Sequence, residues 1–233
     1  MLLASVLFDK IINFISSLDN QLLLLVNGMH STFLDYFMFL YCDRYIWIPL
    51  WIALFYLLLR VMSWKMALLG LVICGLIILF CDKITVQVIR PYFMRFRPSH
   101  SDDPMLSCVH IVNNYRGGKF GFPSAHSANS WALTFYIYLL LRNRVLTWFM
   151  VFWALIICYS RMYLGVHFPT DLFAGCLIGL FASSLSYFLL KRYFAYQRPP
   201  AEAVARHSRI PIAVGLILIA GMLVYSGIKV LSS

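Results

Sequence analysis

Long apolar segments separated by short polar ones run through most of this chain, and the pattern predicts helices that cross a membrane. Several of these segments approach the roughly 20 residues that a helix needs to span a bilayer. We expect spans at residues 45–59, 66–89, 124–141, 145–163, 170–190 and 210–230. The chain is therefore predicted to be an all-α polytopic membrane bundle with about six transmembrane helices.

The first 42 residues carry more polar interruptions than the spans do. Residues 2–16 are typical of a short amphipathic helix, and Asp19 stands where a helix cap is expected. Residues 21–42 are apolar but repeatedly interrupted, which favours one or two helices that lie in the membrane interface. We expect a single integral-membrane domain over residues 1–233, with interfacial helices at 1–42, a core at 45–191 and an additional C-terminal span at 210–230.

Composition supports a membrane protein and accounts for its positive charge. Hydrophobic residues make up 62% of the sequence and charged residues 12%, against about a quarter charged in soluble proteins. The net charge of +10 would favour nucleic acid binding in a soluble chain. In a membrane protein, basic cytoplasmic loops and anionic lipid headgroups explain it, and the sequence shows no basic–aromatic groove or zinc-ligand spacing. We therefore exclude nucleic acid as a partner.

The six cysteines are scattered along the chain without paired spacing. Most lie in apolar segments, where cysteine behaves as a small hydrophobic residue. Cys108 is in a polar loop, and a disulfide bond with Cys42 is compatible with an oxidising face.

Short basic loops define the predicted orientation. Basic residues cluster near 60–65, 142–144 and 191–209, which all lie on one side of the predicted bundle. The positive-inside rule assigns that side to the cytoplasm. A long polar loop at 90–122 and a polar motif at 160–171 then share the opposite face, which we place on the periplasmic side of a bacterial inner membrane. The arginines of this face depart from the rule and indicate a site that binds anions.

The motif at residues 160–171 places Arg161, His167 and Asp171 within a dozen residues of an otherwise apolar region. Ionisable groups at such depth are costly and usually functional. His167 and Asp171 are four residues apart, the spacing that brings side chains to one helical face, and Pro169 between them suits the first turn of a helix. We expect His167 just before a helix and Asp171 in its first turn.

This arrangement suggests nucleophilic chemistry on phosphate. The Asp171 carboxylate can accept the proton on one imidazole nitrogen of His167, which leaves the other nitrogen free to attack an electrophile. Arg161 supplies a planar cation that suits phosphate oxygens. The alternative is an Arg161–Asp171 pair that only neutralises two buried charges, with His167 packed beside it.

Two other segments supply groups of the same kind. Ser124 opens a predicted helix, where free backbone amides and its hydroxyl can hold an anion. His126 can act as a general acid toward a leaving oxygen; the alternative is a helix cap with a hydrogen-bonded histidine. Arg90, Arg95 and Arg97 bring three guanidinium groups to the same face, although a single arginine at a helix end more often extends into the interface.

The three segments together resemble the signature of the type-2 phosphatidic acid phosphatase superfamily, whose soluble relatives are vanadium haloperoxidases. That signature begins with a basic residue, six residues and Arg-Pro. It continues with Pro-Ser-x-His, and it ends with Ser-Arg, five residues, His, three residues and Asp. The second part matches residues 123–126, and the third matches residues 160–171.

The first part of the signature fits this chain in two ways. Lys83 with Arg90-Pro91 has the required spacing and the family's usual lysine, and Arg90 with Arg97-Pro98 has the same spacing. We favour the second, because Arg97-Pro98 leads into the polar loop as this family's Arg-Pro typically does, and because Lys83 lies deeper in its span. This choice departs from the usual lysine at the first position.

The resemblance implies a role for each matched residue. His167 would attack phosphorus to form a phosphohistidine, Asp171 would orient it, and His126 would protonate the departing oxygen and then activate water. The phosphate oxygens would be held by Arg90, Arg97, Ser124 and Arg161. Since these cations supply the positive charge, we expect no cofactor and no metal ion.

The predicted function is hydrolysis of a phosphomonoester or pyrophosphate of a membrane lipid on the periplasmic face. The candidate substrates are undecaprenyl pyrophosphate, lipid A phosphate, phosphatidylglycerophosphate and phosphatidic acid. The cationic loop favours a headgroup with more than one phosphate, as in the first two. The alternatives from other classes are a non-catalytic lipid-binding protein and an anion or proton transporter, although the sequence lacks the inverted repeats typical of a transporter.

Overall fold

The computed structural model describes residues 2–232, with side chains described from residue 9 onward. The regular elements of this part of the chain are helices, and Phe96 and Phe120 form one isolated antiparallel bridge. The helices are α1 (Leu2–Gly28), α2 (Thr32–Tyr41), α3 (Ile48–Val61), α4 (Trp64–Asp82), a π-helical segment (Lys83–Ile89), α5 (Arg90–Phe93), α6 (Ala125–Leu141), α7 (Arg144–Tyr163), α8 (Pro169–Tyr193), α9 (Ala201–His207) and α10 (Arg209–Leu231). The predicted all-α class is confirmed.

Some of the helices are long enough to cross a membrane, and others are apolar but shorter. Those long and apolar enough to cross a membrane are Trp64–Phe93, Arg144–Tyr163, Pro169–Tyr193 and Ala201–Leu231. A pair bent by 115°, Asp9–Gly28 with Thr32–Tyr41, is a fifth candidate if it counts as one span. The chain is therefore a multi-pass membrane protein. The predicted spans 45–59 and 124–141 are also helical, but α3 and α6 have only 14 and 17 residues.

The N-terminal helix departs from the prediction. α1 runs through Asp19 without a break, so the predicted helix cap at this position is wrong. Asp19 is only 2% exposed and forms hydrogen bonds with Arg95 and Thr170, which belong to other parts of the fold. These tertiary contacts override the preference of aspartate for helix caps. The chain breaks instead before α2, where the Ser31 side chain accepts a hydrogen bond from a backbone N–H of that helix.

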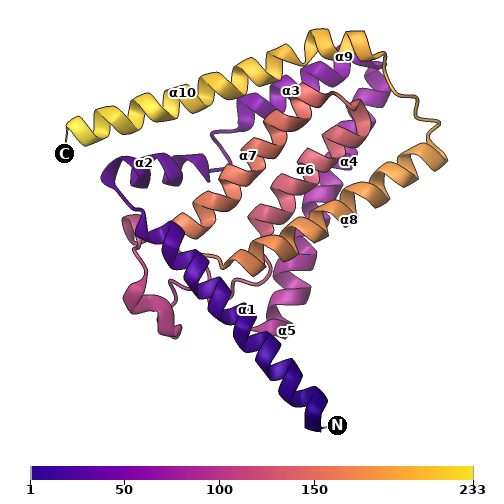
Figure 1. Cartoon of the computed structure of the whole chain (residues 1–233). Helices are drawn as coiled ribbons and strands as arrows, with labels where there is room; N and C mark the ends of the chain where they lie inside the picture. The colour runs from indigo at the N-terminus through magenta and orange to yellow at the C-terminus, as the bar shows by residue number, and fades with distance from the viewer. Residues whose placement is uncertain (1, 233) are drawn as a thin grey trace.

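α6 and α8 form the most extensively packed helix pair and run parallel, side by side (Figure 1). Gly175 and Gly179 on α8 face the backbone of α6, where an added Cβ atom would lie 2.5 Å from the carbonyl oxygens of Ser124 and Ala128 respectively. Small residues allow such close approach between membrane helices. Because the two helices are parallel, both begin at the same end of the bundle.

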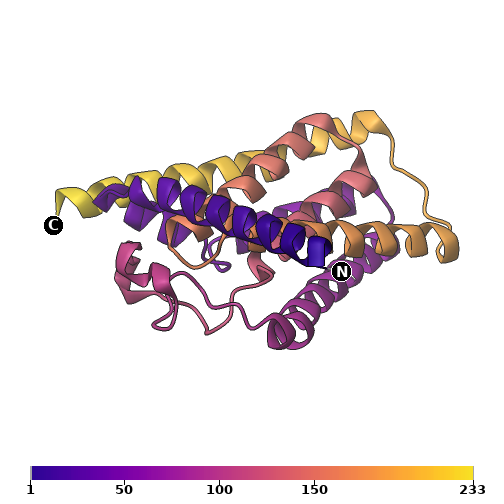
Figure 2. The same ribbon diagram turned by 60° about the horizontal axis from the view of Figure 1, so that its bottom comes forward.

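The remaining helices enclose this pair. α10 crosses the bundle and packs against α2 and α3, while α1 packs against α7 and α8 (Figure 1). The long loop between α5 and α6 lies at the end of the bundle where α6 and α8 begin, as Figures 1 and 2 show. It contains two short 3₁₀ turns, Pro104–Cys108 and Val112–Asn114. This loop, the starts of α6 and α8 and the end of α7 therefore share one face of the molecule.

Candidate active site

Two helix N-termini meet at this face and are joined through the backbone. The Ser124 N–H donates to the Asp171 carbonyl at 2.9 Å, which connects the start of α6 with the first turn of α8. Free amides and helix dipoles at such positions favour negative charge. The turn before α8 requires Gly165, because its φ is +66° and an added Cβ atom would lie 2.3 Å from Val109 Cγ1. This turn sets His167 directly before the helix.

His167 and Asp171 lie where the sequence predicts them, before α8 and in its first turn. Both side chains are fully buried, and His167 Nδ1 lies 3.3 Å from Asp171 Oδ2. The same carboxylate oxygen accepts the Phe168 N–H at 3.0 Å. Pro169 stands in the first turn of the helix, as expected from its fixed φ and missing N–H. Local spacing alone therefore produces the histidine–carboxylate pair.

The contacts of His167 determine its tautomer. Arg97 Nη1 lies 2.9 Å from His167 Nε2, and a guanidinium group can only donate. Nε2 must then accept, so Nδ1 carries the proton and donates it to Asp171. Burial, followed by the charges of Arg97, Arg161 and Arg90, holds the pKa of His167 well below its ordinary value of 6.5. The imidazole is therefore neutral at physiological pH, with its nucleophilic lone pair on Nε2.

Arg97 and Arg161 bring two buried guanidinium groups to this pair. Arg97 also donates to the Val166 carbonyl at 2.9 Å, and burial together with the charges of Arg161 and Arg90 lowers its pKa to about 9. Arg161 donates to the Tyr115 hydroxyl at 3.2 Å and to Cys42 Sγ at 3.5 Å. Among the described residues, neither Arg97 Nε nor Arg161 Nε has a hydrogen-bond partner. Buried cations with unused donors form a site suited to a phosphate group.

The other predicted phosphate ligands, Arg90 and Ser124, contact the start of α6 and not His167 itself. Arg90 Nε and Nη2 donate to the Pro123 carbonyl at 3.3 and 3.2 Å, just before α6. The Ser124 hydroxyl is buried and caps α6, accepting the Ser127 N–H at 3.4 Å. Lys83, the alternative first residue of the signature, lines an apolar cavity that also reaches His126. The structure thus brings Arg97 into contact with His167, and Arg90 holds the backbone next to Ser124.

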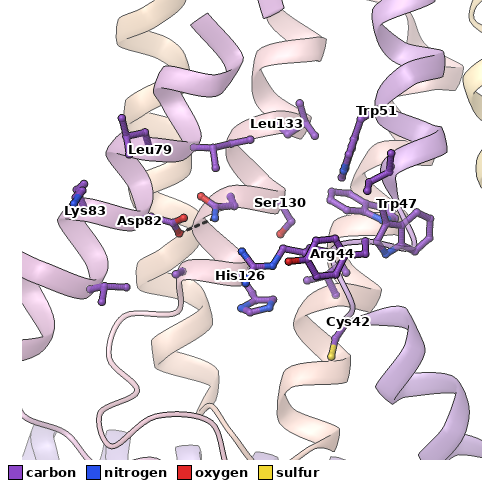
Figure 3. A pocket seen from close by; sticks show the side chains of 18 of the residues that line it. Cys42, Arg44, Trp47, Trp51, Leu79, Asp82, Lys83, His126, Ser130 and Leu133 are labelled. Atoms are coloured by element: carbon purple, nitrogen blue, oxygen red, sulfur yellow. Dashed lines mark hydrogen bonds between the residues drawn. The ribbon is translucent and has the colours of Figure 1, made fainter. Parts of the chain in front are cut away.

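His126 lies at one end of an apolar cavity of about 740 Å³ between α3, α4, α6 and α7 (Figure 3). Trp47, Trp51 and Leu133 form part of its wall. Figure 3 shows Arg44 and Cys42 near His126, and farther along the cavity a hydrogen bond of 2.9 Å from Asn129 Nδ2 to Asp82 Oδ1. The second predicted histidine therefore stands where a cationic site meets an apolar cavity.

Several residues of the site were not assigned from the sequence. Arg95 contacts Asp171 and Asp19, although the sequence identified it only as one of three clustered arginines. Tyr115 and Cys42 hold Arg161 from positions 46 and 119 residues away, and no local spacing signals such contacts. Both Cys42 and Cys108 are free thiols, so the disulfide bond that the sequence left open is not formed.

Comparison with known proteins identifies the family. The pattern of the PAP2 superfamily matches residues 64–194, which is more than half of the chain. The chain belongs to the PAP2 superfamily. This PAP2 protein is 41% identical over 220 residues to the lipid A 4'-phosphatase of Bacteroides thetaiotaomicron, covering 92% of this chain and 98% of that one. It is 35% identical over 176 residues to the lipid A 4'-phosphatase of Porphyromonas gingivalis, covering 75% and 73%.

A solved structure shares the fold of this PAP2 protein. It is the PAP2 type phosphatidylglycerolphosphate phosphatase from Bacillus subtilis, with a TM-score of 0.57 and 23% identity over 79% of this chain and 90% of that one. The predicted resemblance is confirmed, and so is the predicted enzyme class. The protein is a membrane lipid phosphatase.

Proposed function

We propose that this phosphatase removes the 4'-phosphate of lipid A by attack of His167 on phosphorus. The observation that carries the chemistry is the contact of 2.9 Å between His167 Nε2 and Arg97 Nη1, together with the buried Nε–H donors of Arg97 and Arg161 that have no partner among the described residues. The observation that favours the substrate is the 41% identity to a lipid A 4'-phosphatase along nearly the whole of both chains. Of the lipids that the sequence suggests, lipid A phosphate is therefore the preferred one.

In the first half-reaction, His167 Nε2 attacks the phosphorus atom in line with the bond to the lipid oxygen. The N–P bond forms as the P–O bond breaks, and His126, in its imidazolium form, gives its proton to the departing oxygen and becomes neutral. Asp171 stabilises the charge that develops on the imidazole through the Nδ1 proton. Arg97 moves from Nε2 to a phosphate oxygen. The products are a phosphohistidine and the dephosphorylated lipid.

In the second half-reaction, His126 takes a proton from a water molecule that attacks the same phosphorus. The P–O bond to water forms, the N–P bond breaks, and His167 regains its neutral form as inorganic phosphate leaves. The charge on the phosphate oxygens is balanced throughout by Arg90, Arg97 and Arg161, with Ser124 and the amides at the start of α6. Positioning and fixed positive charge supply the catalysis, so the proposed mechanism is independent of metal ions.

The apolar cavity supports a lipid as the leaving group. It begins beside His126, which we assign as the acid for the lipid oxygen, and its wall is made of tryptophan and aliphatic side chains. We also include α3 and α6 as spans, which gives about six transmembrane helices, the C-terminal one included. We propose that the active-site face lies on the periplasmic side of the inner membrane, because the short loops at the opposite end of the bundle are basic.

The test is phosphate release by the purified protein in detergent, measured with the four candidate lipids in the presence of EDTA. We expect lipid A phosphate to be the best substrate, with release unaffected by the chelator and abolished in His167→Ala and in His126→Ala. Preference for another lipid would replace the proposed substrate but keep the mechanism. Release that persists in His167→Ala would contradict the mechanism. No release from any lipid would favour a binding or transport role.

A further inference from the structure

The Asp171 carboxylate is held on both of its oxygens. Oδ2 accepts from His167 Nδ1 at 3.3 Å and from the Phe168 N–H at 3.0 Å. Oδ1 accepts from Arg95 Nη1 at 3.0 Å. A carboxylate with only one partnered oxygen can rotate about its terminal bond, whereas partners on both oxygens fix its plane. Arg95 therefore helps to determine how Asp171 faces the imidazole.

Arg95 is itself held by several groups. Its Nη1 donates to Thr170 Oγ1 at 2.7 Å, and its Nη2 donates to Asp19 Oδ2 at 2.6 Å. Its guanidinium carbon lies 4.1 Å from the centre of the Phe168 ring. The planar fork of arginine is suited to bridging two carboxylates while it stacks on an aromatic ring, which the ammonium group of lysine cannot do. The guanidinium group of Arg95 is thus held by hydrogen bonds at both of its terminal nitrogens and by an aromatic ring against one face.

Asp19 completes this chain of contacts from the N-terminal helix. Its Oδ1 accepts the Thr170 N–H at 2.9 Å, one of the free amides at the start of α8, and its Oδ2 accepts the Thr170 hydroxyl as well as Arg95. The side chain is 2% exposed. A buried carboxylate on a helix that is largely apolar is costly unless such partners exist. α1 lies outside residues 64–194, the part that matches the PAP2 superfamily.

We propose that Asp19 and Arg95 are positioning residues that act on the reaction through Asp171, so that α1 forms part of the catalytic machinery. The inference rests on the roles proposed above for His167 and Asp171. Neither residue has a contact with the N–H donors of Arg97 and Arg161, which line the position expected for the phosphate. Loss of either positioning residue should therefore slow formation of the phosphohistidine and leave phosphate binding unchanged.

The experiment compares Asp19→Asn, Arg95→Gln and the double variant with Asp9→Asn, which removes an exposed carboxylate from the same helix. We expect kcat to fall about 10- to 100-fold in Asp19→Asn and in Arg95→Gln, since small misplacements of reacting groups cause losses of this size. The Ki for inorganic phosphate should stay within about twofold of wild type in both. The double variant should lose no more activity than Arg95→Gln, because residues that act as a unit are not additive.

Three outcomes would overturn the inference: equal kcat in Asp19→Asn and Asp9→Asn, multiplicative losses in the double variant, or a weakening of phosphate binding parallel to the loss of kcat. If Asp19→Asn does not fold, the Arg95→Lys variant tests the inference instead, because lysine keeps the charge but cannot bridge the carboxylates of Asp19 and Asp171. Its kcat should lie between those of wild type and Arg95→Gln, with an unchanged phosphate Ki. An active His167→Ala would instead contradict the proposed function itself.

Discussion

The two halves of the active site differ in how fully their polar groups are paired. On the side of the proposed nucleophile, both nitrogens of His167 and both oxygens of Asp171 have partners. On the phosphate side, Arg97 and Arg161 are buried, and the Nε of each lacks a partner among the described residues. Unpaired buried donors cost free energy, so they persist where a ligand satisfies them. The proposed nucleophile is thus assembled in advance, while the proposed phosphate position would be completed only by the substrate.

The largest effect should come from breaking the paired half. Asp171→Asn replaces a carboxylate by an amide that can donate to Nδ1, which favours the wrong imidazole tautomer. We expect kcat to fall by about 10,000-fold, as in other histidine–carboxylate pairs, and the phosphohistidine to be undetectable after acid-free quenching of the labelled enzyme. Asp102→Asn is the control, because Asp102 is 55% exposed in the loop. A loss of less than about tenfold in Asp171→Asn would show that the pairing does not set the tautomer.

Removing a cation from the unpaired half should have opposite effects on activity and stability. Arg97→Gln should lower kcat/KM about 100- to 1,000-fold, because it deletes a donor to the transferred phosphoryl group. The same change should raise the Tm of the ligand-free protein, because it removes a buried charge that repels Arg161 and Arg90.

Inorganic phosphate provides the matching measurement for Arg97. It should raise the Tm of the wild type, whose cations it neutralises, and have little effect on Arg97→Gln. Arg144→Gln, at the exposed start of α7, serves as the control. A lower Tm in ligand-free Arg97→Gln would mean that the guanidinium stabilises the resting fold.

A glycine at the junction of the two halves offers a smaller perturbation. An added Cβ at Gly121 would lie 3.1 Å from Asp171 Oδ2, 3.2 Å from Arg97 Cγ and 3.6 Å from His167 Nδ1. Gly121→Ala should therefore shift both halves by a few tenths of an ångström and lower kcat about tenfold. At Gly118, in the same loop, an added Cβ would meet nothing within 4 Å, so Gly118→Ala should behave as wild type. Equal activity of the two variants would contradict tight contact at the junction.

The smallest expected effect is on the pH dependence of stability. The pKa of His167 is held below 6.5 in the folded protein by burial and arginine charge, and is about 6.5 in the unfolded chain. Below pH 6.5 the unfolded state binds a proton that the folded state does not. The free energy of unfolding should therefore decrease as the pH is lowered, by up to about 1.4 kcal/mol per pH unit, until the pKa of the folded state is reached. Between about pH 7.5 and 5.5, Tm should therefore fall more in the wild type than in His167→Gln. Equal slopes would show that His167 does not resist protonation.

The helices and the core of the site could be predicted because both follow from local sequence. Apolar length predicts the spans, and the i,i+4 spacing with an intervening proline predicts how His167 meets Asp171. The link from Asp19 to Arg95 could not be predicted, because it joins positions 76 residues apart and local preference favoured a helix cap. Likewise, Cys42 meets Arg161 only because α2 packs against α7. Such contacts depend on tertiary packing and leave no periodic signal.

The hydrogen bond from Arg97 to His167 Nε2 has a consequence for chemical selectivity. In the resting enzyme the lone pair is covered by a cation, and only a group that attracts this cation uncovers it. A phosphate monoester carries the charge to do so. A carboxylic ester is neutral and leaves the guanidinium in place, so we expect carboxylic esters to be spared. The enzyme would then distinguish phosphate esters from carboxylic esters by whether each can displace an arginine.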